Sequence, residues 1–106
     1  MPFVRIGRAD EFNPERMVPV GILGRRIGIF RETDGSWAAI ELNCRHQKAD
    51  LTYGRRRGDI VVCPLHSWEY DLRTGECLTV PDSPLRRFSI EVRDGEVFLS
   101  TTPQER

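Results

Sequence analysis

The residues best suited to chemistry in this chain are two mixed pairs of cysteine and histidine. Cys44 and His46 form the first pair, in the sequence Cys-Arg-His, and Cys63 and His66 form the second, in Cys-Pro-Leu-His. The chain has only two histidines, and each of them stands close to a cysteine. Short spacings let two side chains from one turn reach a common point, which is how proteins present metal ligands. We therefore predict that these four residues bind metal.

Three kinds of site use cysteine and histidine together. A mononuclear zinc site is one, but its usual spacings pair cysteine with cysteine and histidine with histidine. A cysteine nucleophile activated by a histidine is another, and it would leave one complete pair without a role. The third is a 2Fe-2S cluster in which two cysteines hold one iron and two histidines hold the other. Two loops that each supply one cysteine and one histidine favour this third kind.

The elements that must position these residues are predicted to be β-strands. No stretch keeps apolar residues at helical spacing over ten or more positions, whereas short alternating runs recur between turn signals. Strands are expected at residues 3–6, 17–22, 60–62 and 68–72. Pro19 cannot donate a ladder hydrogen bond, so the second of these strands should lie at a sheet edge. The predicted fold class is all-β.

Two Asp-Gly pairs, at 34–35 and 94–95, predict β-hairpins on either side of the ligand stretch. Two-residue turns at these positions set the following cross-strand pairs: Ile29 with Ile40, Ile27 with Leu42, Val92 with Val97, and Ile90 with Leu99. In each hairpin this register gathers aliphatic side chains on one face, and Phe88 continues the face of the second hairpin. The sequence therefore predicts four aliphatic side chains on a single face of the first hairpin.

Composition limits the classes of partner. A chain of 106 residues suits a single domain, residues 1–106, with one modest core. Sixteen basic and sixteen acidic residues cancel, so no overall field favours nucleic acid or an anionic membrane surface. There is no apolar run of the roughly 18 residues needed to span a bilayer, and the first residues lack the apolar region of a signal peptide. We expect a soluble, cytoplasmic, monomeric protein.

Two further features accompany the ligand stretch. The third cysteine, Cys77, has no histidine beside it and is expected to behave as a small hydrophobic residue. The arginines at 55–57, with Arg45 and Lys48, make the stretch locally basic. This run is either a solvated segment that caps a turn or a docking patch for an acidic partner surface.

The sequence resembles the Rieske proteins, and in particular the small soluble Rieske-type ferredoxins. The matching stretches are CRH at 44–46, CPLHSWEYDLRTGECL at 63–78 and VPDSPL at 80–85, followed by a strand-DG-strand hairpin. The resemblance implies an antiparallel β-sandwich base that carries a small cluster-binding subdomain, at about residues 43–71. It also implies one Rieske 2Fe-2S cluster. The ligands would be Cys44 and Cys63 on the inner iron, and His46 and His66 on the outer iron.

The resemblance also assigns supporting roles around the cluster to Trp68, Tyr70 and Pro81. Trp68 is expected to act as a hydrophobic lid, and Pro81 to lie in a covering loop. Tyr70 matches a tyrosine whose hydroxyl donates toward a cysteine sulfur in high-potential Rieske proteins. That class also has a disulfide and a serine donor, whose positions are taken here by Ala49, Leu65 and Trp68. Fewer donors stabilise the reduced cluster less, so we expect a potential low in the family's span of roughly −150 to +300 mV.

The function implied by the resemblance is one-electron transfer, without enzymatic activity of the chain itself. Rieske oxygenases react at a separate iron that needs two further histidines, and both histidines here are already assigned. A Gly-rich nucleotide-binding fingerprint is also missing. The expected partners are a flavin-dependent reductase and a terminal oxygenase. Two alternatives stay open: the Rieske-like small subunit of a nitrite reductase, and a redox or iron sensor.

Overall fold

The computed structural model describes residues 3–13, 15–22, 24–42, 54–64, 67–80 and 84–104. In this part of the chain the regular structure is β-strand apart from one short 3-10 turn, η1 (Ala9–Glu11), and the strand pairings are antiparallel. The predicted all-β, antiparallel fold is confirmed. Within the same residues, no helix has the length and apolar character needed to cross a membrane.

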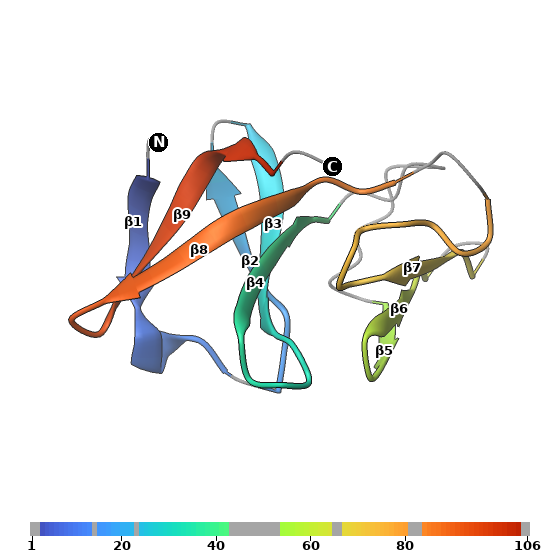
Figure 1. Ribbon diagram of the computed structural model, residues 1–106, viewed down its shortest axis with the longest axis horizontal. Helices are drawn as coiled ribbons and strands as arrows, with labels where there is room; N and C mark the ends of the chain where they lie inside the picture. The colour runs from blue at the N-terminus through green and yellow to red at the C-terminus, as the bar shows by residue number, and fades with distance from the viewer. Residues whose placement is uncertain are drawn as a thin grey trace.

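The described strands form two sheets (Figure 1). The larger one, here the base sheet, has six strands in the spatial order β1 (Phe3–Arg8), β9 (Glu96–Pro103), β8 (Arg87–Arg93), β4 (Trp37–Glu41), β3 (Arg25–Arg31), β2 (Val18–Ile22). The smaller one, here the small sheet, has three strands in the order β5 (Arg55–Arg57), β6 (Ile60–Val62), β7 (Glu69–Asp71). Strand β2 lies at an edge of the base sheet, as predicted from Pro19.

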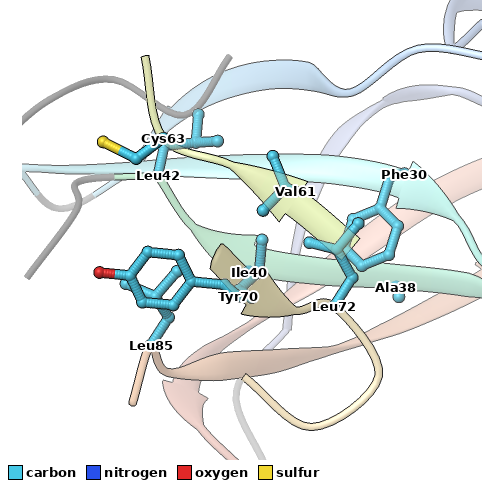
Figure 2. Close-up of a cluster of buried hydrophobic side chains, with 9 residues drawn as sticks. All are labelled: Phe30, Ala38, Ile40, Leu42, Val61, Cys63, Tyr70, Leu72 and Leu85. Atoms are coloured by element: carbon cyan, nitrogen blue, oxygen red, sulfur yellow. The ribbon is translucent and has the colours of Figure 1, made fainter. Parts of the chain in front are cut away.

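Two hydrophobic cores stabilise these sheets, and the second of them joins the two sheets to each other. The first lies on one face of the base sheet, which curls around it, and contains Phe12, Ile27, Ile29, Ala39, Phe88, Val97 and Leu99. The second, here the inter-sheet core, joins the base sheet to the small sheet (Figure 2) and contains Phe30, Ala38, Ile40, Leu42, Val61, Cys63, Tyr70, Leu72 and Leu85. Strands β3 and β4 therefore bury side chains on both of their faces.

The predicted register of the first hairpin is wrong by one residue. Ile29 pairs with Ala39, and Ile40 pairs with Gly28. The turn holds three residues, because the Glu32 N–H donates to the Ser36 carbonyl at 2.8 Å. Residues 27 and 29 consequently face the core of the base sheet, while residues 40 and 42 face the inter-sheet core. The four aliphatic side chains are thus divided between the two cores.

The second hairpin has the predicted register. Val92 pairs with Val97, and Ile90 pairs with Leu99. The two turn residues at 94–95 have φ angles of +53° and +76°, as a two-residue turn of this kind requires. The strands predicted near 60–62 and 68–72 are also present, as β6 and β7.

Candidate metal centre

The hairpin of β6 and β7 positions Cys63. Val62 pairs with Glu69, so the chain reverses direction between residues 63 and 68. The Cys63 N–H donates to the Trp68 carbonyl at 2.7 Å and closes this loop. Ser67 has a φ of +58°, a left-handed conformation that is uncommon for a residue with a side chain and that recurs at ligand sites. The backbone of Cys63 is therefore tied to that of Trp68 at the end of the small sheet.

Cys63 lies at one end of the inter-sheet core and is only 2% exposed. Figure 2 shows its sulfur and the hydroxyl of the fully buried Tyr70 at the same end of this core, away from Phe30 and Ala38. Trp68 packs half-buried against the same core. A thiolate there would be shielded from bulk water, and a phenol hydroxyl can donate a hydrogen bond. These features fit a cysteine ligand of an iron–sulfur cluster.

The structure describes part of the predicted site. Cys63 and Tyr70 belong to the inter-sheet core, and Trp68 packs against it. The other predicted site residues lie outside the described residues: Cys44, His46, His66 and Pro81. Within the described part of the chain, no three side chains of metal-binding type gather at one point. The complete ligand set therefore stays a prediction.

Cys77 contributes to packing, in line with the expectation for it. It is half-buried against the inter-sheet core and forms an isolated β-bridge with Tyr70. Its sulfur accepts a hydrogen bond from the Val80 N–H at 3.3 Å. Cys77 thus supports the strand that carries Tyr70.

The arginine run forms strand β5, which sequence patterns did not predict because three arginines show no apolar alternation. Its members have different environments. Arg55 and Arg57 are exposed, whereas Arg56 is half-buried and donates to the Arg31 carbonyl at 2.6 Å. Arg57 lies 3.9 Å from Glu69, an exposed pair that contributes little. Of the three described arginines, Arg57 thus lies beside an acidic side chain, and Arg56 is engaged by a backbone carbonyl.

Asp71 and Arg73 hold the turn that follows β7. The Asp71 carboxylate accepts hydrogen bonds from the Arg73 backbone N–H at 2.9 Å and from its guanidinium at 3.1 Å. Partial burial opposes ionisation of Asp71, but the hydrogen bonds and charge of Arg73 outweigh it, and the pKa of Asp71 lies below its ordinary value. The same hydrogen bond raises the pKa of Arg73. The pair therefore stays ionised at neutral pH.

The sequence profile of the Rieske [2Fe-2S] domain matches residues 3–89. The chain belongs to this family. One Rieske-type 2Fe-2S cluster is accordingly the cofactor of this Rieske protein. Cys63 is the member of the predicted ligand set whose surroundings are described, and its buried thiol beside Tyr70 is compatible with that cofactor.

Two curated relatives and one solved structure indicate how the domain is used elsewhere. The oxygenase component of 3-ketosteroid-9-alpha-monooxygenase from Mycolicibacterium smegmatis is 29% identical over 101 residues, which cover 89% of this Rieske protein and 26% of the relative. The 3-phenylpropionate/cinnamic acid dioxygenase ferredoxin subunit from Photorhabdus laumondii is 31% identical over 74 residues, covering 68% of this chain and 70% of the subunit. The ferredoxin of carbazole 1,9a-dioxygenase from Nocardioides aromaticivorans IC177 has a TM-score of 0.82 at 27% identity, covering 96% of this chain and 100% of that one.

The coverage differs between these kinds of relative. The Rieske protein spans about a quarter of the length of the oxygenase components it matches. It spans the whole of the carbazole dioxygenase ferredoxin.

Proposed function

We propose that this Rieske protein is a one-electron carrier that passes electrons from a flavin-dependent reductase to the terminal oxygenase of a multi-component system, without itself transforming a substrate. The observation that carries the proposal is the match along the whole length of a dioxygenase ferredoxin. A Rieske cluster supplies reversible one-electron reduction. The chain supplies the ligands, the apolar surroundings and the surface that meets the partner proteins.

We assign Cys44 and Cys63 to one iron and His46 and His66 to the other. The mixed Cys/His pairs support this assignment, since each loop would deliver one ligand of each type. The burial of Cys63 supports its place on the inner iron. The cluster-binding subdomain would comprise about residues 43–71 of a single domain, residues 1–106, and it would include the small sheet.

Three residues would surround the cluster. Tyr70 would donate its hydroxyl hydrogen toward a ligand sulfur, and Trp68 would limit the access of water. Pro81 would belong to a covering loop. We place the carrier in the cytoplasm, because an odd number of cysteines suits a reducing compartment. We expect it to act as a monomer.

Spectroscopy and ligand substitution test the cofactor assignment. The reduced protein is expected to give an electron paramagnetic resonance signal with the low average g value of mixed cysteine and histidine ligation. Cys63→Ser, His46→Ala and His66→Ala should abolish this signal, while Cys77→Ala, the matched cysteine control, should retain it. A signal that survives Cys63→Ser, or that disappears in Cys77→Ala, would overturn the ligand assignment.

Reconstitution tests the role as carrier. With a reductase and an oxygenase encoded near this chain, oxygenase turnover should require this protein and should increase with its concentration. Permanent co-elution with one partner would instead favour the small subunit of a nitrite reductase. Partner binding that depends on the presence of the cluster, without any electron flow, would favour a sensor.

A further inference from the structure

A polar seam joins the base sheet to the small sheet at the tips of two hairpins. The first tip is the β3–β4 turn, and the second is the β5–β6 turn at residues 58–59. Thr33 Oγ1 donates to Asp59 Oδ2 across the seam at 3.2 Å. Arg56 Nη2 donates to the Arg31 carbonyl at 2.6 Å. The seam therefore complements the inter-sheet core with directional contacts between the two sheets.

Arg56 makes three contacts that its neighbours do not make. Besides the bond to the Arg31 carbonyl, its Nε donates to the Gly58 carbonyl at 2.8 Å. Its guanidinium carbon lies 5.2 Å from the centroid of the Phe30 ring, within the range of a cation–π contact. Arg55, on the opposite face of β5, is exposed and has no ion pair with other described residues. The planar guanidinium group of Arg56 donates hydrogen bonds in two fixed directions, and the ammonium group of a lysine could not reproduce this geometry.

The contacts of Arg56 lie at the Phe30 end of the inter-sheet core, and a row of paired residues connects that end to Tyr70. Arg56 pairs with Val61, and Val61 pairs with Tyr70, so the three residues form one cross-strand row. Tyr70 in turn shares the inter-sheet core with Cys63. This row is the structural link between Arg56 and the end of the core that holds the thiol.

We propose that Arg56 is a positioning residue that pins the small sheet to the base sheet and so fixes the orientation in which the cluster-bearing loop is presented. The inference rests on the proposed function in taking the small sheet as part of the cluster-binding subdomain. The contacts of Arg56 themselves stand independently of that function.

Some polar atoms in and near the seam have no hydrogen-bond partner. In the described part of the chain, three buried polar atoms have no hydrogen-bond partner: Arg31 Nε, Asp59 Oδ1 and Arg87 Nε. Buried groups without partners disfavour the packed state. Of these atoms, Asp59 Oδ1 belongs to the seam itself, so Asp59 bonds to Thr33 through Oδ2 alone, and the 2.6 Å bond from Arg56 is shorter than the 3.2 Å bond from Thr33.

Amide hydrogen exchange tests this proposal, using Arg56→Gln and, as a matched control, Arg55→Gln. Both variants remove one charge from the same strand. Arg56→Gln should speed exchange about tenfold in β6 and β7, as expected for the loss of a charge-assisted hydrogen bond, and should leave β8 and β9 unchanged. Arg56→Lys should fall between the wild type and Arg56→Gln. Arg55→Gln should match the wild type in both sheets.

A distance measurement in the holoprotein adds a direct test of positioning. In a Cys77→Ala background, a nitroxide on Glu91→Cys in β8 reports its distance to the reduced cluster. Arg56→Gln should broaden the distribution of this distance, and Arg55→Gln should leave it narrow.

Two exchange results would overturn the proposal. Equal exchange in Arg55→Gln and Arg56→Gln would mean that Arg56 has no special role. Faster exchange throughout both sheets would mean that it serves general stability. A wild-type protein without a 2Fe-2S spectrum would contradict the proposed function instead, and the exchange comparison would still decide the role of Arg56.

Discussion

Tyr70 serves the inter-sheet core and the candidate metal centre through different parts of its side chain. Its ring is completely buried and fills the space between the two sheets. Its hydroxyl lies at the end of the core where the sulfur of Cys63 lies (Figure 2). The packing role and the proposed electronic role can therefore be separated by removing the oxygen alone.

Tyr70→Phe is expected to lower the midpoint potential of the cluster by roughly 40 mV. One hydrogen bond worth about 1 kcal/mol in the reduced state corresponds to that shift in a one-electron couple. Film voltammetry at fixed pH measures it. Phe88→Leu, a change in the core of the base sheet, should leave the potential unchanged. An unshifted potential in Tyr70→Phe would mean that the hydroxyl does not donate to a ligand sulfur.

Asp71 is expected to contribute to stability in a manner that depends on pH. Its folded-state pKa lies below the ordinary value of 3.8 because of Arg73, so its contribution is complete above that value and is lost as the pH falls through the folded-state pKa. In urea unfolding between pH 6 and 3, the wild type should lose more stability on acidification than Asp71→Asn. The exposed Glu91→Gln serves as a control and should follow the wild type. Parallel curves for the wild type and Asp71→Asn would contradict this assignment.

The two Asp-Gly turns show where prediction of the elements from sequence succeeds and where it fails. At residues 94–95 both turn residues have positive φ, and the hairpin has the register that a two-residue turn predicts. At residues 34–35 only the glycine has a positive φ, and the Asp34 carboxylate accepts the Ser36 N–H at 2.9 Å. That side-chain bond helps to stabilise a longer turn. The dipeptide alone does not distinguish the two cases, because the outcome depends on the flanking residues.

Gly28, in β3, lets the side chains of Leu42 and Met17 pack directly against the backbone of the base sheet. A Cβ added there would lie 2.7 Å from Leu42 Cδ2 and from Met17 Cγ. Gly28→Ala should therefore destabilise the fold by about 1–3 kcal/mol through overpacking, because Leu42 is fully buried and has little room to move. Gly21→Ala in β2 is the matched control, since a Cβ at that position meets nothing within 4 Å.

Denaturant unfolding of the two glycine variants measures the difference. A lower midpoint with an unchanged slope is expected for Gly28→Ala, because the change affects packing in the folded state. Equal midpoints for the two variants would show that Met17 and Leu42 adjust without cost.

At the scale of the whole molecule, the sequence predicts the cofactor of the site better than it predicts the contacts that hold the site in place. The spacing of the Cys/His pairs and the stretch after Cys63 are enough to predict the family and the cofactor, because ligand chemistry depends on residues that are close in sequence. The inter-sheet core and the role of Arg56 depend on contacts between strands that are distant in sequence. Periodicity in the sequence does not specify such contacts, so they became evident only from the folded chain.

Strands β1 and β9 are neighbours in the base sheet, and Phe3 lies opposite Ser100 (Figure 1). Strand β1 begins opposite Ser100, whereas β9 continues to Pro103, and the Gln104 N–H donates to the Arg87 carbonyl on the side of the base sheet nearer the small sheet. The first and last described strands are thus neighbours, as is common in domains that tolerate insertion into a longer polypeptide. The same fold can thus serve as a separate small protein in one system and as one domain of a larger protein in another. The matches accord with this, since they include a whole ferredoxin and about a quarter of a longer oxygenase component.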